Sequence, residues 1–261
     1  MKTDFGFLPN LSDEDKLLAT NVVDWAESAQ SRFKLKYTHF LNEKQCDIAV
    51  SVLNSVGHSS FMLYGGYENA KRRMLCVYNE YDEPDAAGFP FTAFTVRFPK
   101  NFELSHRDFL GALMSLNIKR ESVGDILINN GVCVMFVEDS VAHVVSSELS
   151  KVGRVGVDIS EGCEALSSMD LSDKFMSISG TVASMRLDCV LALALNMSRS
   201  KIAPLIASGK VAVNNFERMA CDIVLKENDV FSVKGYGKFL LSEIGGKSRK
   251  DRIFLRISKY I

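Results

Sequence analysis

The chain has 261 residues, of which 47% are apolar and 24% are charged. This composition is that of an ordinary globular protein and excludes a largely disordered chain, while the length predicts about two domains or three small ones. The longest apolar run, residues 190–195, is far shorter than the ~20 residues that a membrane-spanning helix needs. Asp4 and Pro9 stand where a signal peptide would have its apolar core. We therefore expect a cytoplasmic protein without a membrane partner.

The cysteines and histidines show no spacing typical of a metal or redox site. The cysteines are Cys46, Cys76, Cys133, Cys163, Cys189 and Cys221, and the histidines are His39, His58, His106 and His143. No two cysteines form a CxxC pair, and the histidines form neither an HxxxH nor an HExxH motif. We expect the cysteines to be reduced and packed in hydrophobic cores, and we expect no metal and no cofactor.

The net charge of −1 is unevenly distributed along the chain. Residues 1–179 contain 17 Lys and Arg against 25 Asp and Glu, whereas residues 180–261 contain 14 against 7. The front of the chain is therefore at −8 and the tail at +7. A cationic tail attracts polyanions such as nucleic acids. The alternative is a basic surface that is merely solvated, and charge alone does not separate the two.

Residues 1–90 are expected to form an N-terminal α/β region. Apolar side chains from Leu17 to Phe33 follow helical spacing, and Ser12 precedes three acidic residues that suit the first turn of a helix. A second helix is expected over 43–56, followed by strands at 61–67 and 74–79. The turn-forming, acidic stretch 81–90 predicts a domain boundary.

Residues 91–175 are expected to form a second domain with the element order β-α-β-β-α-β. Ser105 precedes an amphipathic helix, and Asn130-Gly131 is typical of a tight hairpin turn. The expected strands are 91–98, 125–129, 132–138 and 155–159, and the second helix begins at Asp139. This order is that of a ferredoxin-like or RRM-like sandwich.

Residues 180–261 are expected to form a small third domain, which makes the chain an α+β protein. A strand near 174–182 leads into a helix over 185–195, and a second helix begins after Ser198 and ends at Gly209, a suitable C-terminal cap. Strands are expected within 211–215, 229–239 and 251–260. Two short helices on a small sheet would complete this domain.

The tail resembles the S4 RNA-binding domain. The resemblance lies in MRLDCVLALALNMSRSKIAPLIASGKVAVNN (185–215) and DVFSVKGYGKF (229–239), whose matching residues keep a fixed order over about 75 positions. The matching residues are Arg186, Leu187, Asp188, Ser198, Arg199, Ser200, Lys201, Gly209, Val211, Val213, Asn214, Asp229, Gly235 and Gly237. The stretches GGYENAKRRM (65–74) and SHRDFLGALMSLNIKRESVGDI (105–126) resemble the YlmH-like family of bacterial S4 proteins, so the resemblance covers most of the chain.

The start of the second tail helix is a candidate phosphate site. Arg199 and Lys201 fall in its first turn, where the helix dipole already places positive charge, so cations are unfavourable there unless an anion neutralises them. Free N–H groups, Ser198 and two cations would bind a phosphate. The alternative is that Ser198 only caps the helix and the cations are solvated. Arg186 could reach the same RNA backbone, oriented by Asp188. Weaker candidate contacts are Lys210, Asn214, Lys234 and Lys238.

Three positions depart from the pattern of the resembled families. Pro204 falls inside the second tail helix, where proline usually causes a kink. Lys71 stands where members of the resembled family usually have an acidic residue, and Asn117 stands where they usually have glycine. In the middle domain Phe136 is the only aromatic residue of strand 132–138, so we expect this sheet to bind RNA poorly.

The sequence favours a binding protein over an enzyme. The S4 domain often accompanies catalytic domains, but the glycine-rich loop of a methyltransferase and the catalytic aspartate of a pseudouridine synthase are not recognisable here. The resemblance implies a non-enzymatic protein that binds structured RNA (rRNA, with tRNA) at the bacterial large ribosomal subunit, in rescue or quality control, and no DNA. The alternative is an RNA-modifying enzyme, similar to a pseudouridine synthase or a methyltransferase, whose active site lies within residues 1–175.

Overall fold

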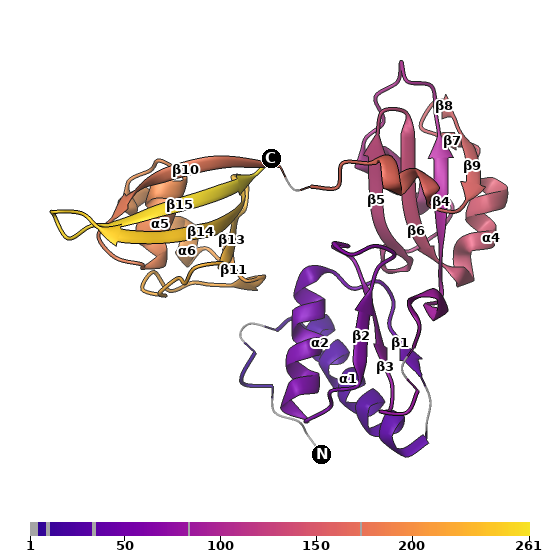
Figure 1. The fold of residues 1–261 in the computed structure, drawn as a ribbon, viewed down its shortest axis with the longest axis horizontal. Helices are drawn as coiled ribbons and strands as arrows, with labels where there is room; N and C mark the ends of the chain where they lie inside the picture. Colours follow the sequence, from indigo (N-terminus) through magenta and orange to yellow (C-terminus); the bar gives the residue numbers. More distant parts are fainter. Residues whose placement is uncertain (1–4, 9–10, 33–34, 83, 173) are drawn as a thin grey trace. The chain divides into compact units, whose positions relative to one another are not determined.

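The computed structural model describes residues 5–8, 11–32, 35–82, 84–172 and 174–261 (Figure 1). Asp4, Pro9 and Phe33, which the sequence analysis used, lie outside these residues. The chain divides into two compact units, one containing Ser12–Leu171 and the other containing Ser172–Ile261. Each unit is described separately below.

The first unit begins with two packed helices, α1 (Asp13–Arg32) and α2 (Glu43–Ser55). Ser12 and Asp15 cap α1 reciprocally, because the backbone N–H of each donates to the side chain of the other at 3.1 Å. Lys44 of α2 forms an ion pair of 2.7 Å with Asp15 and so ties the two helices together. Both helices are confirmed as the sequence predicted them.

A three-stranded antiparallel sheet lies beside these helices, in the order β1-β3-β2. Its strands are β1 (Lys36–Tyr37), β2 (Phe61–Tyr64) and β3 (Met74–Val77). β2 and β3 are shorter than the sequence predicted, and β1 was not predicted. Two residues are too few to show an alternating pattern, so only their pairing with β3 identifies them as a strand.

A four-stranded antiparallel sheet forms the other half of the first unit, in the order β5-β6-β4-β9. The elements in chain order are β4 (Phe91–Arg97), α3 (His106–Ser115), β5 (Val123–Asn129), β6 (Val132–Glu138), α4 (Asp139–Glu148) and β9 (Asp158–Glu161). The predicted β-α-β-β-α-β order is therefore present. Asn130 and Gly131 both have positive φ, which makes the tight β5–β6 turn that their sequence predicted.

The predicted strand at 155–159 is wrong in its position. Residues 155–156 form β8 (Val155–Gly156), which pairs with β7 (Lys151–Val152) in a separate small hairpin. Gly153 has φ of +60° and allows the tight turn between the two. The fourth strand of the main sheet is β9, which begins three residues later.

Both faces of the four-stranded sheet are covered. Side chains of β4, β5 and β6 pack on one face against α3 and α4, around Phe109, Leu113 and Val145. Alternate side chains pack on the other face against β1, β2, β3 and the short helices η1 (Ala86–Gly88) and η3 (Glu164–Ser168). The two predicted front domains thus share one core, and a boundary near residue 90 stays a prediction.

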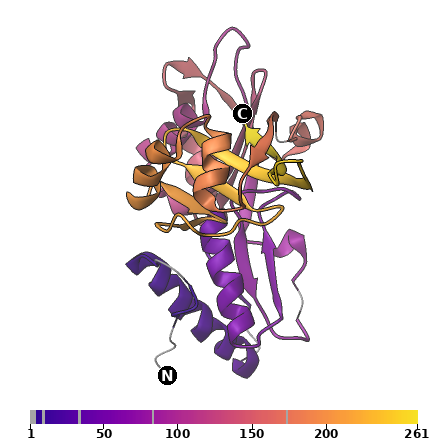
Figure 2. The same ribbon diagram turned by 90° about the vertical axis from the view of Figure 1, so that its left-hand side faces the viewer.

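The second unit is a six-stranded antiparallel sheet with two helices (Figures 1 and 2). The helices are α5 (Leu187–Ala194) and α6 (Arg199–Ala207), and the sheet order is β10-β15-β14-β13-β11-β12. The strands are β10 (Phe175–Val182), β11 (Val211–Val213), β12 (Phe216–Glu217), β13 (Val230–Val233), β14 (Gly237–Lys247) and β15 (Ile253–Tyr260). The helices pack on one face of the sheet, over a core that includes Phe231, Phe239 and Ile257.

The departures noted in the sequence are accommodated locally. Helix α6 runs without interruption through Pro204, and the Pro204 side chain is exposed. Asn117 follows α3 with φ of +59°, a conformation that asparagine tolerates better than most residues, so it can replace glycine there. No single described helix is long and apolar enough to cross a membrane, and α5 with α6, which together meet that test, are bent by 115°.

Candidate nucleic-acid interface

Asp188 is the centre of the charged corner where α5 and α6 begin. Its side chain is buried, and its two oxygens accept hydrogen bonds from Arg186 Nε at 3.2 Å and Arg199 Nε at 2.9 Å. The Nη2 atom of Arg199 donates to the same carboxylate. Arg186 precedes α5 and Arg199 opens α6, so one aspartate fixes the guanidinium groups of both helices. Asp188 was expected to orient Arg186, and in the structure it contacts Arg199 as well.

This arrangement changes the electrostatic argument for Arg199. The anion that neutralises its position in the first turn is Asp188, so the position does not by itself require a phosphate. Burial alone would raise the pKa of Asp188, but the hydrogen bonds from Arg199 and Arg186 outweigh burial and lower it. The Arg186 and Arg199 side chains remain 42% and 57% exposed, so each still presents N–H donors to a ligand.

Lys201 and Ser198 are exposed on the same helix start. The Ser198 and Ser200 hydroxyls lie 2.9 Å apart, so Ser198 does not make the simple backbone cap that was the alternative hypothesis. Among the described residues no acidic group lies within ion-pair distance of Lys201. Lys201 is therefore the first-turn cation that still needs an external anion, such as a phosphate, to neutralise it.

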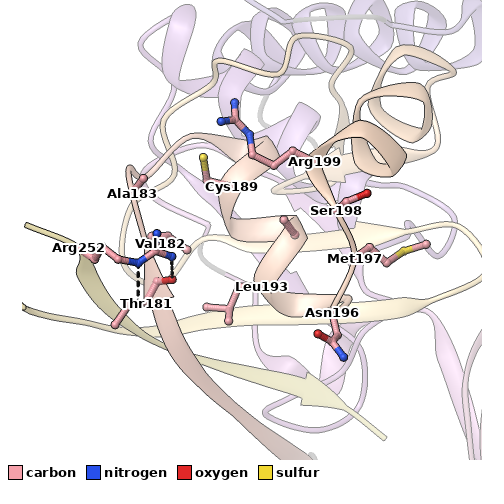
Figure 3. A pocket seen from close by; sticks show the side chains of 11 residues that line it. Thr181, Val182, Ala183, Cys189, Leu193, Asn196, Met197, Ser198, Arg199 and Arg252 are labelled. Carbon is pink, nitrogen blue, oxygen red and sulfur yellow. Dashed lines mark hydrogen bonds between the residues drawn. The ribbon is translucent and has the colours of Figure 1, made fainter. Parts of the chain in front are cut away.

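A hollow of about 490 Å³ adjoins this corner (Figure 3). Ser198 and Arg199 line one side of it, and Arg252, from the β14–β15 hairpin, lines the opposite side next to Thr181. Arg252 Nε donates to Thr181 Oγ1 at 2.9 Å, which holds the guanidinium against β10. Arg252 was not among the predicted contacts, although the run KSRKDR (247–252) is the most cationic stretch of the tail and could have indicated it.

Lys210 and Lys234 lie together at a different place in the second unit. The backbone N–H of Lys234 donates to the Lys210 carbonyl at 2.9 Å, and both residues line a hollow of about 350 Å³. Gly235 and Gly237, which have positive φ, and Glu217 also line it. The two predicted contacts are thus neighbours, but they share their hollow with an acidic residue.

Asn214 and Lys238 have structural partners. The Asn214 amide donates to Asp229 Oδ1 at 2.8 Å and accepts from the Val230 backbone N–H at 2.9 Å. Both ends of the amide therefore hold the turn after β11, and RNA contact by Asn214 stays a prediction without structural support. The Lys238 ammonium lies 5.4 Å from the centre of the Tyr260 ring.

The comparisons with known proteins agree in pointing to one family. Residues 84–164 match a family model described as "Putative RNA-binding domain in YlmH". The ribosome-associated protein quality control protein P2 of Bacillus subtilis is 28% identical over 243 residues, which are 92% of this chain and 93% of the relative. A solved structure, the cell division protein ylmH from Streptococcus pneumoniae, aligns with a TM-score of 0.53 at 21% identity and covers 63% of this chain and all of that chain.

The chain is similar to the YlmH-like family over most of its length. The segment of this YlmH-like protein that matches the family model contains the four-stranded sheet of the first unit. Phe94 and Phe136 of this sheet are not available for stacking on bases: they are 0% and 1% exposed, and the Phe136 ring packs against Tyr67 and Phe91. A Cβ added at Gly66 would collide with this ring, and a Cβ added at Gly124 would collide with the Phe40 ring.

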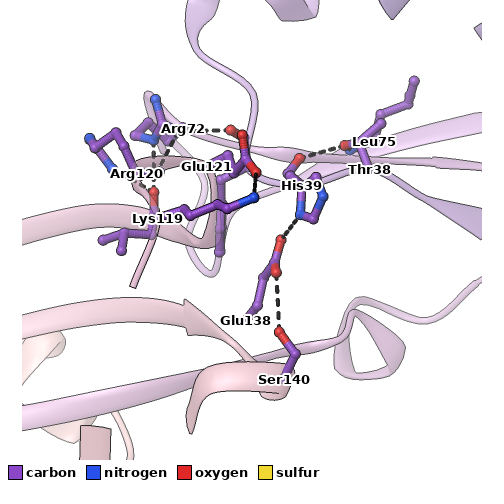
Figure 4. A network of polar contacts seen from close by, with 11 residues as sticks. Thr38, His39, Arg72, Leu75, Lys119, Arg120, Glu121, Glu138 and Ser140 are labelled. Carbon is purple, nitrogen blue, oxygen red and sulfur yellow. Dashed lines mark hydrogen bonds and ion pairs between the residues drawn. The ribbon is translucent and has the colours of Figure 1, made fainter. Parts of the chain in front are cut away.

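The basic residues beside this sheet are also engaged within the YlmH-like fold (Figure 4). Arg72 donates to the carbonyl oxygens of Phe40, Val123 and Arg120, and burial lowers its pKa to about 10. Arg120 donates to the Val123 carbonyl at 2.6 Å. Asp125 accepts from three groups of the 65–74 stretch, at Tyr67, Lys71 and Arg72. Residues 65–74, one of the stretches that resemble the family, therefore connect the three-stranded and four-stranded sheets of the first unit through these hydrogen bonds.

Proposed function

We propose that this protein is a non-enzymatic adaptor that binds folded RNA through an S4-type module formed by residues 180–261. The observation that carries the proposal is the corner at the start of α5 and α6. There Arg199 and Lys201 are exposed and Arg186 is partly exposed, and Asp188 holds both arginines in fixed orientations. Oriented guanidinium groups and a helix start bind the phosphate backbone and recognise RNA by its shape more than by its sequence.

Three further observations support this proposal. The tail has a charge of +7, which favours a polyanionic partner. The Bacillus subtilis relative, which aligns with 92% of this chain, is named as ribosome-associated, and the family model that matches residues 84–164 is described as RNA-binding. We infer that the folded RNA is ribosomal RNA, together with tRNA, on the large subunit, and that the role is rescue or quality control of stalled subunits.

The front of the chain is suited to a different kind of contact. Its charge of −8 opposes a broad contact with RNA, so we infer that it contacts protein. The β-α-β-β-α-β order and the β5-β6-β4-β9 sheet support our assignment of residues 91–175 as an RRM-like module. The buried position of Phe136 supports a structural role for that sheet.

An RNA-modifying activity in the front unit is the alternative. A hollow of about 360 Å³ there is lined by His58, Asn79, Glu80 and Tyr81 among others. His58 is buried, and its Nε2 atom contacts the Ser60 carbonyl at 3.0 Å. Nε2–H donates this hydrogen bond and so fixes the ring in the fold, and because the ring is buried we favour a binding function.

The test is the binding of a folded tRNA by the full chain carrying Lys201→Glu. We expect a weaker affinity and a salt dependence of log Kd whose slope is smaller by about one, because one phosphate contact is lost. Arg199→Glu is a poor test, because it would place a second carboxylate beside buried Asp188. Lys16→Glu makes the same charge change on α1 and serves as control. Equal affinities of the two variants and the unaltered protein would overturn the assignment of this corner.

A further inference from the structure

One face of the six-stranded sheet in the second unit is not covered by α5 or α6, and we call it the open face. The strand register places Phe175, Tyr260 and Lys238 next to one another at one end of this face, because Phe175 pairs with Tyr260 and Lys238 lies on the neighbouring strand. The side chains that alternate with them, such as Ile257 and Phe239, point into the core beneath the helices. The aromatic end is therefore on the opposite face from the α5–α6 helices.

The aromatic side chains of this end are partly exposed. Phe175 is 44% exposed, and its ring meets the Tyr260 ring edge-on with centres 4.8 Å apart. In an edge-on pair neither ring covers both faces of the other, so Tyr260 leaves a face of the Phe175 ring uncovered for a stacked base. In contrast, Phe94 and Phe136 on the four-stranded sheet of the first unit are buried. Within the described residues the open face is thus the sheet surface that combines exposed rings with cations.

The surroundings of the two rings suit a nucleotide chain. The Lys238 ammonium lies 5.4 Å from the Tyr260 ring centre, and exposed Lys174 precedes Phe175. The Lys238 ammonium can meet a phosphate next to a base that stacks on Phe175. Small hydroxyl side chains continue the same face along the strands: Ser177 pairs with Ser258. The register puts two acids on this face: Glu243, which Arg256 neutralises at 2.8 Å, and Glu217, at the far end of the row that contains Lys238.

We propose that the open face binds single-stranded RNA, with an unpaired base stacked on Phe175 and a flanking phosphate on Lys238. The proposal rests on the proposed function, since it assumes a chain that also holds folded RNA at the α5–α6 corner. It adds a second contact of different chemistry. The corner binds phosphates of a helical RNA, whereas the open face binds a base through its π surface and needs that base to be unpaired.

The experiment compares two RNA hairpins that differ only in a four-nucleotide unpaired 3′ tail containing 2-aminopurine, whose fluorescence falls when it stacks. With the full-length protein we expect the tailed hairpin to bind at least about fivefold tighter than the blunt one, the lower end of what one stacked base contributes. We expect the fluorescence to fall on binding. In Phe175→Leu, which keeps an apolar side chain but loses the ring, both effects should disappear, whereas Phe175→Tyr should keep them.

Phe102 offers a matched control, because it is 45% exposed and lies in the first unit. Phe102→Leu should leave the advantage of the tailed hairpin unchanged. If the tailed hairpin has no advantage, or if Phe175→Leu keeps it, the open face does not stack RNA bases and the proposal is wrong. Lys201→Glu should weaken the binding of both hairpins equally and keep the fluorescence response at saturation. This result separates failure of the corner from failure of the open face.

Discussion

Asp188→Asn tests whether the corner of the second unit depends on oriented arginines or only on their charge. The substitution keeps the size of the side chain and removes its negative charge. A hydrogen bond to a charged group contributes about 1.5–3 kcal/mol. Asp188 accepts from two guanidinium groups, but both are about half exposed and regain water when it is neutralised, so we expect a total loss of about 2 kcal/mol.

Hydrogen exchange of the α5 and α6 amides measures this loss where it occurs. Fluorescence of the single tryptophan, Trp25, reports on α1 in the other unit and is unsuitable. A loss of about 2 kcal/mol corresponds to roughly 30-fold faster exchange of amides protected by opening of these helices. Asp222→Asn removes a negative charge from an exposed position of the same unit and should leave the exchange rates unchanged.

The pH dependence has a definite sign. The folded pKa of Asp188 is lowered from its ordinary value of 3.8, so the ionised carboxylate stabilises the unit above that pH. This stability is lost as the pH falls through the folded pKa, because protonation removes the same charge as the substitution. The difference in stability between the two proteins should therefore shrink below pH 3.8. A difference that persists unchanged into acid would show that the effect is not electrostatic.

RNA affinity separates orientation from charge. Asp188→Asn makes the corner more positive by one charge, so a purely Coulombic surface would bind tRNA more tightly. If Asp188 positions Arg186 and Arg199, affinity should fall despite the added charge, because mobile guanidinium groups lose entropy on binding. An increase in affinity in filter binding, together with unchanged hydrogen exchange, would refute our account of Asp188.

Two further predictions concern the whole chain. Phe136→Ala should destabilise the first unit by about 3–5 kcal/mol, measured by urea unfolding followed through Trp25 fluorescence, because the ring is fully packed. At a temperature where the variant is folded, its affinity for tRNA should not change. A loss of tRNA affinity would show that the four-stranded sheet binds RNA. In sedimentation of a cell lysate at moderate salt, the protein should travel with large-subunit particles; a protein that stays at the top of the gradient, or follows messenger RNA, would contradict the ribosomal partner.

Local patterns in the sequence determined much of this protein. Ser12 with its acidic neighbours, the Asn130-Gly131 turn and the strand-like runs 91–98 and 132–138 predicted elements that the structure contains, because caps, turns and short apolar runs act within a few residues of the chain. The uneven charge also needed no structure, since it is a sum over residues. The resemblance of the tail and of the 65–74 stretch indicated the YlmH-like family.

Tertiary structure alone decided which side chains are available. Arg199 and Asp188 are eleven positions apart, and only the bend between α5 and α6 brings them together, so the sequence could not show that the first-turn cation already has an anion. Phe136 and Phe175 both lie on strands, yet one is buried by the sheet of the N-terminal region and the other is exposed on the open face. Periodicity tells which residues share a face of a strand, but what covers that face depends on packing between distant segments.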